Sequence, residues 1–443
     1  MKCKITSLNN TWNLHMLNSD GFVSLLNIYR SEIMIKRTIF IVLLVLSIKT
    51  LLAQKPPILN PGKWHASLLR TDGRHIPVQF EVKEESKKLA IYIVNGTERL
   101  KTEPILIVKD SAIIKMPVFE SYFKVKFITK DSINGFWIRG AENKDIILPF
   151  AASAKLKPSA NLSAKTAANI AGKWAIEFTR ANQSTRPAIG QFIQNENSVS
   201  GSILTPAGDY RYLNGTVSGG SFTLSTFDGI HAMLFEAKIE GDTIKGSLLS
   251  GASGKESWIA TRNEQAALPA TPLTTVKEGS NGIPDFKFND LNGNSVSIKD
   301  ERYKNKVVIL QIMGSWCPNC MDETAFLSEY YKKNKHKGIE IIALSYELST
   351  DNERSKKSLK KFQTRFDVQY PILLTGITVS DPKKTEKTLP QLTDIKVFPT
   401  TVFIDKTGKI SYVETSFYGP ATGQHYSKYK EEFEKTVNLL LKQ

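Results

Sequence analysis

Cysteine is scarce in this chain, which has 443 residues and only three cysteines. Cys3 lies in an N-terminal stretch that we expect to be absent from the mature protein, so Cys317 and Cys320 would be its only thiols. Two thiols exclude both a framework of several disulfides and a zinc site with four cysteine ligands. The chemistry of the remaining pair therefore depends on its spacing and its surroundings.

A long apolar run is also missing near the N-terminus. The run Thr38 to Ile48 has 11 residues and ends at Lys49, whereas a membrane-spanning helix needs about 20. Its charged start and the small residue near its end predict a signal peptide over 34–53, with an uncleaved membrane anchor as the alternative. No cysteine lies directly after the run, so we expect no lipid anchor. Residues 1–33 resemble neither a signal nor a domain, and we expect translation to start at Met34.

Positive charge is abundant but not concentrated in one region. The net charge is +16, and the basic runs 332–337 and 354–361 lie on the exposed faces of predicted helices. This distribution argues against a nucleic-acid partner. Weak association with an anionic membrane surface is the alternative to plain solvation.

The two thiols lie in the segment Trp316-Cys317-Pro318-Asn319-Cys320. A β-branched strand is predicted before it, over 306–314, and a helix after it, from Met321. Cys317 then lies in the first helical turn, where free backbone N–H groups and the helix dipole favour a thiolate. The pattern predicts a redox dithiol in which Cys317 is the nucleophile and Cys320 resolves.

Three other interpretations of the pair are possible. The thiols could be inert core residues, a purely structural short-range disulfide, or two ligands of a zinc site completed by His336 or His425. Zinc usually takes four protein ligands, or three and a water. No second metal-like cluster is visible in the sequence, and we expect no cofactor.

The residues after the pair predict further elements of an α/β domain. Apolar runs predict strands, and apolar residues at steps of three and four predict helices. The expected elements are strands over 339–347, 370–374 and 397–405, a helix over 351–366, a hairpin partner over 410–417 and a C-terminal helix.

Residues 283–443 resemble the TlpA/ResA-like extracytoplasmic thiol–disulfide oxidoreductases. The resemblance is carried by the W-C-x-x-C motif, by Pro399 before a strand and by the entry hairpin Ile283 to Ile298. It implies an α/β thioredoxin-like domain, with a central mixed sheet flanked by helices. It also implies that Pro399 is a cis-proline facing the dithiol.

The same resemblance assigns roles to individual residues. Cys317 attacks a substrate disulfide and Cys320 resolves the mixed disulfide, while Trp316 shields the site. Glu323 tunes the cysteines, unless it is only a first-turn acid favoured by the helix dipole. An extended substrate segment would pair by strand addition with the backbone at Phe398, Pro399 and Thr400.

The sequence departs from cytoplasmic thioredoxins at the expected buried acid. Gln311 stands there, six residues before the first cysteine. Proton transfer is then expected to run through Glu323, Glu347 or water. The pair between the cysteines is Pro318-Asn319 and not Gly-Pro, so the redox potential of thioredoxin does not transfer.

The preceding part of the chain is β-rich and weakly repeated. Short alternating strands and Gly, Asn and Asp turns predict an all-β sandwich or barrel region. Each half opens with Gly-Lys-Trp, at Gly62 and at Gly172. The expected division is β-rich domains over 54–150 and 170–263, linkers over 151–169 and 264–282, and the thioredoxin-like domain over 283–443.

A polar and aromatic set in the second β-rich half could line a ligand pocket. The alternative is turn chemistry together with half-buried aromatic side chains. The candidates are Tyr210, Tyr212, Phe227, Asp228 and His231.

These patterns favour a periplasmic or cell-envelope disulfide reductase. Its expected partners are protein thiol or disulfide clients, with apocytochromes as one candidate, and a membrane-linked electron donor. The expected role is in cytochrome c maturation or in redox homeostasis. One alternative is a thiol peroxidase, but Gly314 and Ser315 stand where its signature threonine is expected. The other is a binding protein in which the β-rich domains carry the function.

Overall fold

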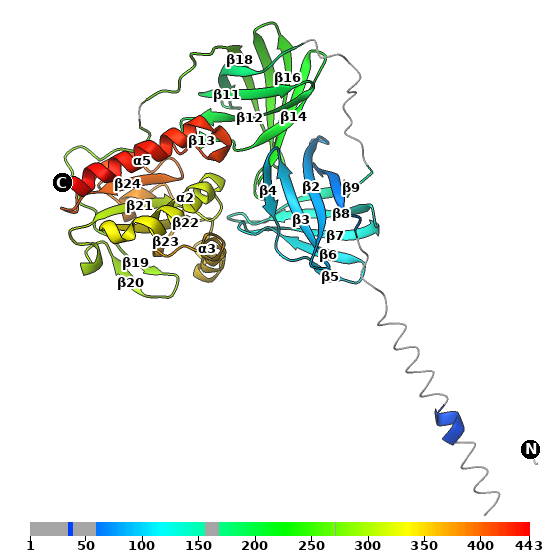
Figure 1. Cartoon of the computed structure of the whole chain (residues 1–443), viewed down its shortest axis with the longest axis horizontal. Helices are drawn as coiled ribbons and strands as arrows, with labels where there is room; N and C mark the ends of the chain where they lie inside the picture. Colours follow the sequence, from blue (N-terminus) through cyan, green and yellow to red (C-terminus); the bar gives the residue numbers. More distant parts are fainter. Residues whose placement is uncertain (1–33, 39–58, 156–167, 271) are drawn as a thin grey trace, which may run out of the picture. The chain divides into compact units, whose positions relative to one another are not determined.

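The structure is a computed structural model that describes residues 34–38, 59–155, 168–270 and 272–443 (Figure 1). The expected start at Met34 and the signal peptide over 34–53 fall mostly outside these ranges, as do residues 1–33 and the middle of the expected linker 151–169. Residues 34–38 are helical and belong to a unit separate from residues 57–443. Within the described ranges, no helix combines the length and apolar character needed to cross a membrane.

The first sheet is open and entirely antiparallel. Its order is β4-β3-β2-β1-β9-β8-β7-β6-β5, so β4 and β5 are its edges. Alternation in β2 buries Ile76, Val78 and Phe80 against Trp64 of β1, as a sheet with one covered face requires. The strands are β1 (Gly62–Leu69), β2 (His75–Glu85), β3 (Lys88–Asn95), β4 (Glu98–Lys101), β5 (Leu106–Val108), β6 (Ser111–Lys115), β7 (Ser121–Thr129), β8 (Ser132–Arg139) and β9 (Ile146–Ser153).

The second sheet closes into a barrel, because β11 pairs with both β10 and β12. Its interior is filled by large buried side chains, among them Trp174, Phe235 and Trp258. The expected all-β region is thus an open sheet followed by a closed barrel. The strands are β10 (Gly172–Thr179), β11 (Thr185–Asn195), β12 (Ser198–Thr205), β13 (Gly208–Asp209), β14 (Leu213–Ser218), β15 (Ser221–Phe227), β16 (Ala232–Glu240), β17 (Thr243–Ser250) and β18 (Gly254–Arg262).

The third sheet is mixed and has the order β20-β19-β23-β22-β21-β24-β25. β21, β22 and β23 are parallel, and β24 runs antiparallel to β21. This confirms the expected thioredoxin-like arrangement. The strands are β19 (Lys287–Asp290), β20 (Ser295–Ser297), β21 (Val307–Met313), β22 (Ile339–Glu347), β23 (Ile372–Thr378), β24 (Thr400–Ile404) and β25 (Ile410–Glu414).

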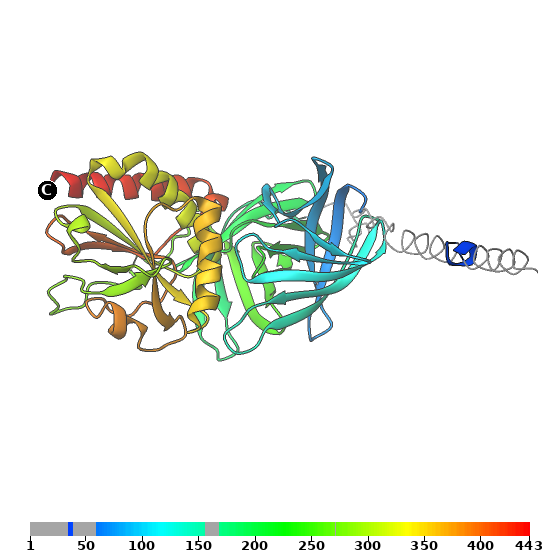
Figure 2. The same cartoon turned by 90° about the horizontal axis from the view of Figure 1, so that it is seen from below.

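Both faces of this sheet are covered by other elements. β21 and β22 are therefore buried along their whole length, as central strands of such sheets are. One face shares a core with α2, α3 and α5, and the other packs against α4 and the segment before β24. Figure 2 shows the domain from a second direction, with α5 in red. The helices are η1 (Glu301–Tyr303), α2 (Pro318–Asn334), η2 (Lys335–Lys337), α3 (Asn352–Phe366), α4 (Lys384–Thr388), η3 (Pro420–Thr422) and α5 (Gln424–Lys442).

Candidate active site

The cysteine pair lies where β21 gives way to α2. Cys317 is the N-cap of α2, Pro318 is its first residue, and the Cys317 Sγ accepts a hydrogen bond from the Cys320 N–H at 3.1 Å. Proline is favoured at this position because its missing N–H is not needed there. The two cysteines form a disulfide. The helix N-terminus thus points its free donors at the sulfur of Cys317.

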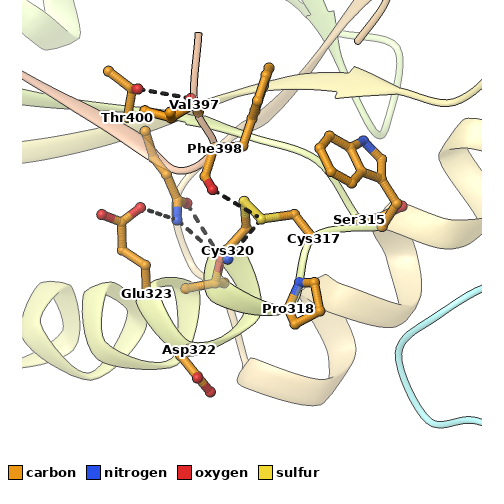
Figure 3. Close-up of a disulfide and its surroundings, with 12 residues drawn as sticks. Ser315, Cys317, Pro318, Cys320, Asp322, Glu323, Val397, Phe398 and Thr400 are labelled. Atoms are coloured by element: carbon orange, nitrogen blue, oxygen red, sulfur yellow. Dashed lines mark hydrogen bonds between the residues drawn. A yellow bond between two sulfur atoms is a disulfide. The ribbon is translucent and has the colours of Figure 1, made fainter. Parts of the chain in front are cut away.

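The segment before β24 faces the disulfide, as Figure 3 shows. The Phe398–Pro399 peptide bond is cis, the geometry that the resemblance implied. The Phe398 carbonyl oxygen lies 3.5 Å from the Cys317 Sγ. Thr400 turns inward, since its hydroxyl donates to the Val397 carbonyl at 2.9 Å. The backbone of Phe398, and not the side chain of Thr400, therefore borders the sulfur.

Trp316 forms one side of the site. Its Nε1 donates to the Tyr346 carbonyl at 2.8 Å, and its ring meets that of Phe398 edge-on at 5.4 Å. A Cβ at Gly314 would lie 2.2 Å from Nε1, so only glycine admits this ring position. The indole therefore has a fixed position next to Cys317.

The two sulfurs differ in access. Cys317 is 4% exposed and Cys320 is fully buried. Cys317 borders a cleft of about 190 Å³, which is also lined by Trp316, Pro318, Asn319 and Phe398. An incoming sulfur can thus reach Cys317 only.

Glu323 is buried on the inner side of α2. It accepts hydrogen bonds from Gln311 Nε2 at 2.8 Å, Thr401 Oγ1 at 2.5 Å and Tyr429 Oη at 3.0 Å. Burial raises the pKa of Glu323 to about 7, although these donors oppose the shift. The carboxyl group can therefore take up or release a proton near neutral pH. Gln311, the residue at the expected acid position, is one of its donors.

Glu347 is a second buried acid, at the end of β22. Its carboxylate accepts from the Ser315 backbone N–H at 2.9 Å and from the Ser315 hydroxyl at 2.5 Å. Burial raises the pKa of Glu347 to about 7. Through these two hydrogen bonds, Glu347 fixes the position of Ser315, which directly precedes Trp316 and Cys317 in the chain.

Known proteins resemble the part of the chain that carries this site. Residues 277–423 match the family model described as Redoxin. Thiol-disulfide oxidoreductase ResA of Bacillus thuringiensis subsp. konkukian is 33% identical over 127 residues, 29% of this chain and 64% of that protein. ResA of Geobacillus kaustophilus is 30% identical over 145 residues, 33% of this chain and 73% of that protein. The chain belongs to the ResA family of thiol-disulfide oxidoreductases.

The match with the ResA relatives does not extend over their whole length. The chain spans just under two thirds of the length of the first relative, at 64%. Among solved structures, a putative thiol:disulfide interchange protein DsbE from Chlorobium tepidum is similar over 38% of this chain and 99% of its own, with 20% identity and a TM-score of 0.29.

The barrel contributes further residues beside the ResA-family domain. Of the pocket candidates from the sequence, Tyr210, Asp228 and His231 line the cleft at Cys317. Phe227 instead packs in the core of the first sheet, against Phe123 and Trp137.

Asp228 is buried beneath this cleft and accepts three hydrogen-bonding contacts. Its Oδ1 accepts from the backbone N–H groups of Ile230 and His231, and its Oδ2 lies 3.1 Å from His231 Nδ1. Burial opposes its charge, but His231 and these two N–H groups hold the pKa of Asp228 below its ordinary value. The carboxylate thereby fixes the turn that carries His231.

Arg211, which no sequence pattern marked as a site residue, reaches the cysteine motif from the barrel. Its Nη1 donates to the Pro318 carbonyl at 3.1 Å and lies 2.5 Å from Asp322 Oδ2. No local pattern identifies such an arginine, because its partners are more than 100 residues away in the sequence.

Proposed function

We propose that the chain is an extracytoplasmic thiol–disulfide oxidoreductase that reduces disulfides in exported proteins. The observation that carries this proposal is the disulfide between Cys317 and Cys320 at the start of α2, facing Phe398 and Pro399 in a ResA-family domain. A dithiol in this position can cycle between reduced and oxidised states without a cofactor.

In the reductive direction, the Cys317 thiolate attacks a sulfur of the client disulfide. One client sulfur leaves as a thiolate and takes a proton, and the other stays in a mixed disulfide with Cys317. Cys320 then loses its proton and attacks the Cys317 sulfur, which releases the second client thiol and re-forms the Cys317–Cys320 disulfide. A membrane-linked donor returns two electrons to the pair, and Cys320 takes up one proton, which restores the Cys317 thiolate and the Cys320 thiol.

Surrounding residues would support these steps. Trp316 would shield the sulfur, and the backbone at Phe398, Pro399 and Thr400 would hold an extended client segment by strand addition. Glu323 would tune the cysteines through its proton, with Gln311 as its donor. These roles are supported by the contacts described above.

Export and organisation belong to the same proposal. A signal peptide over 34–53 would direct the chain to the periplasm or cell envelope, and clients in cytochrome c maturation or redox homeostasis fit that location. The two β-rich domains, 54–150 and 170–263, would present clients to the domain over 283–443. Segments 151–169 and 264–282 would connect them.

Insulin reduction tests the activity. With dithiothreitol as electron source, the full chain should accelerate the reduction of insulin disulfides, and Cys317→Ser should abolish the acceleration. Cys320→Ser should accumulate a mixed disulfide with insulin, because the resolving thiol is gone. His336→Asn, at an exposed position, serves as the control and should behave as wild type. Full turnover by Cys317→Ser would rule the proposal out.

The direction of electron flow needs a separate measurement. The reduction potential is obtained by equilibrating the protein with glutathione and dithiothreitol buffers. A value near or below about −250 mV supports a reductase, since thioredoxin lies near −270 mV. A value near about −120 mV, as in a strong oxidant, would reverse the assigned direction.

A further inference from the structure

Arg211 is a buried arginine between β13 and β14 of the barrel. Its side chain is 4% exposed, and its Nη1 donates to the carbonyl of Pro318, the first residue of α2. The adjoining segment also touches the ResA-family domain, since Asp209 Oδ2 accepts from the Gly419 N–H at 2.7 Å. The guanidinium is therefore held beside the turn that contains Cys317.

A cation in this position acts on the charge of Cys317. A hydrogen bond to the Pro318 carbonyl polarises the peptide unit at the start of the helix. A fixed positive charge near the first turn adds to the helix dipole in favouring an anion at the N-cap. Low solvent access reduces screening of this effect. The Cys317 thiolate is the anion that reduction of the disulfide creates there.

Carboxyl groups surround Arg211 and oppose this effect. Arg211 pairs with Asp322 of α2 and with Glu98 of β4. Although burial opposes its charge, Asp322 and Glu98 raise the pKa of Arg211 above its ordinary value. Burial raises the pKa of Asp322 to about 7. Titratable side chains surround Arg211 and the cleft: Glu98, Asp209, Tyr210, Tyr212, Asp228, His231, Asp322 and Tyr426.

We propose that Arg211 is a positioning residue through which the barrel stabilises the Cys317 thiolate and raises the reduction potential of the dithiol. Reduction breaks the Cys317–Cys320 bond with two electrons and one proton, and it leaves a thiolate at Cys317 and a protonated thiol at Cys320. Stabilising that thiolate favours the reduced form. The inference rests on the proposed redox function of this pair.

The test compares two variants that should act in opposite directions. At pH 8, above the pKa of about 7 that Asp322 has beside Arg211, Arg211→Gln removes the cation, and loss of that cation also raises the pKa of Asp322. We expect the equilibrium with glutathione to shift about tenfold toward the disulfide, which is about 30 mV more negative. Asp322→Asn removes a negative charge and should shift the equilibrium toward the dithiol.

The acidity of Cys317 provides the second readout. The pH dependence of its alkylation by iodoacetamide should move to higher pH in Arg211→Gln and to lower pH in Asp322→Asn. Arg262→Gln is the matched control, because Arg262 pairs with Asp242 within the barrel and stacks on Trp174. It should leave both readouts unchanged.

The outcomes separate a charge effect from a folding defect and from the activity itself. A folding defect would move both variants in the same direction, and that result would overturn the proposal. An Arg211→Gln protein with the wild-type potential and alkylation profile would also overturn it. A wild-type protein with no insulin-reductase activity would contradict the proposed function. The measurements of potential and alkylation would still test the role of Arg211 in that case.

Discussion

Three carboxyl groups of low solvent exposure, Asp322, Glu323 and Glu347, lie near the disulfide, and burial raises the pKa of each to about 7. Their partners differ. Asp322 pairs with Arg211, Glu323 accepts only from neutral donors, and Glu347 binds Ser315. Figure 3 shows Asp322 and Glu323 pointing away from each other, although they are adjacent in the sequence. Each residue therefore has a separate electrostatic effect on the site.

Glu323→Gln tests the buried acid through stability. The pKa of Glu323 is about 7 in the fold and near its ordinary value of 4.5 when unfolded. The folded state thus holds the proton more tightly, and the wild type loses stability as pH rises from about 4.5 to 7. Glu323→Gln has no ionisable group at this position, so it does not lose this stability as the pH rises. Between pH 4 and pH 8 its free energy of unfolding should improve relative to wild type by up to roughly 3 kcal/mol.

Urea unfolding at the two pH values provides the measurement. The exposed Glu431 supplies the control, and Glu431→Gln should track the wild type at both pH values. An equal difference between Glu323→Gln and wild type at pH 4 and pH 8 would show that the Glu323 carboxyl group has no raised pKa.

At the scale of elements, two strand pairings of the barrel bring a glycine very close to the backbone of the neighbouring strand. A Cβ at Gly201 of β12 would lie 2.0 Å from the Gln191 carbonyl oxygen of β11. A Cβ at Gly215 of β14 would lie 1.8 Å from the Thr223 carbonyl oxygen. Neither contact can be relieved by a side-chain rotation, because both partners are backbone atoms. Glycine is therefore required at these two strand pairings.

Gly201→Ala should destabilise the barrel. The added methyl group forces the β11–β12 pairing apart, and overpacking of this kind typically costs about 1–3 kcal/mol. Near-UV circular dichroism during urea unfolding reports on the buried Trp174 and Trp258 of the barrel. Gly220→Ala is the control, since its Cβ would meet nothing closer than 3.7 Å. Wild-type stability of Gly201→Ala would contradict the close pairing.

Local patterns predicted the elements of the ResA-family domain well. The run 339–347 is β22, and Asp351, at the start of a predicted helix, caps α3. The closed barrel could not be distinguished from a sandwich, because both give short alternating strands. The pairing of β11 with β12, and the return of β18 to β10, are what close it. Pairings between strands that are distant in the sequence do not change the hydrophobic periodicity of either strand.

At the scale of the whole molecule, the site draws on residues far apart in the sequence. The C-x-x-C motif identified Cys317 and Cys320, because their chemistry depends on a spacing of three residues. Arg211 reaches that motif from the barrel, and Glu98 reaches Arg211 from the first sheet. A buried arginine looks like any other in the sequence. These contacts follow from tertiary packing, which one sequence does not reveal.

Ion pairs also join the first sheet to the ResA-family domain. Arg354 of α3 binds both oxygens of Glu120, at 2.9 and 3.0 Å, and the two side chains are 27% and 43% exposed. A double-mutant cycle with Glu120→Gln and Arg354→Gln should give a coupling free energy of about 0.2–1 kcal/mol in thermal unfolding. The coupling should vanish in 1 M NaCl, where the Debye length is about 3 Å. A coupling that survives high salt would show that the pair is shielded from solvent.

The near-complete burial of Cys317 has a consequence for when the protein can act. The residue is 4% exposed, and it borders a cleft of about 190 Å³. A disulfide inside a fully folded globular protein cannot enter such a space, whereas a disulfide in an unfolded segment can. On the proposed function, the enzyme works in the interval between the export of a client and the end of its folding. The enzyme then selects clients by how far they have folded as well as by their sequence.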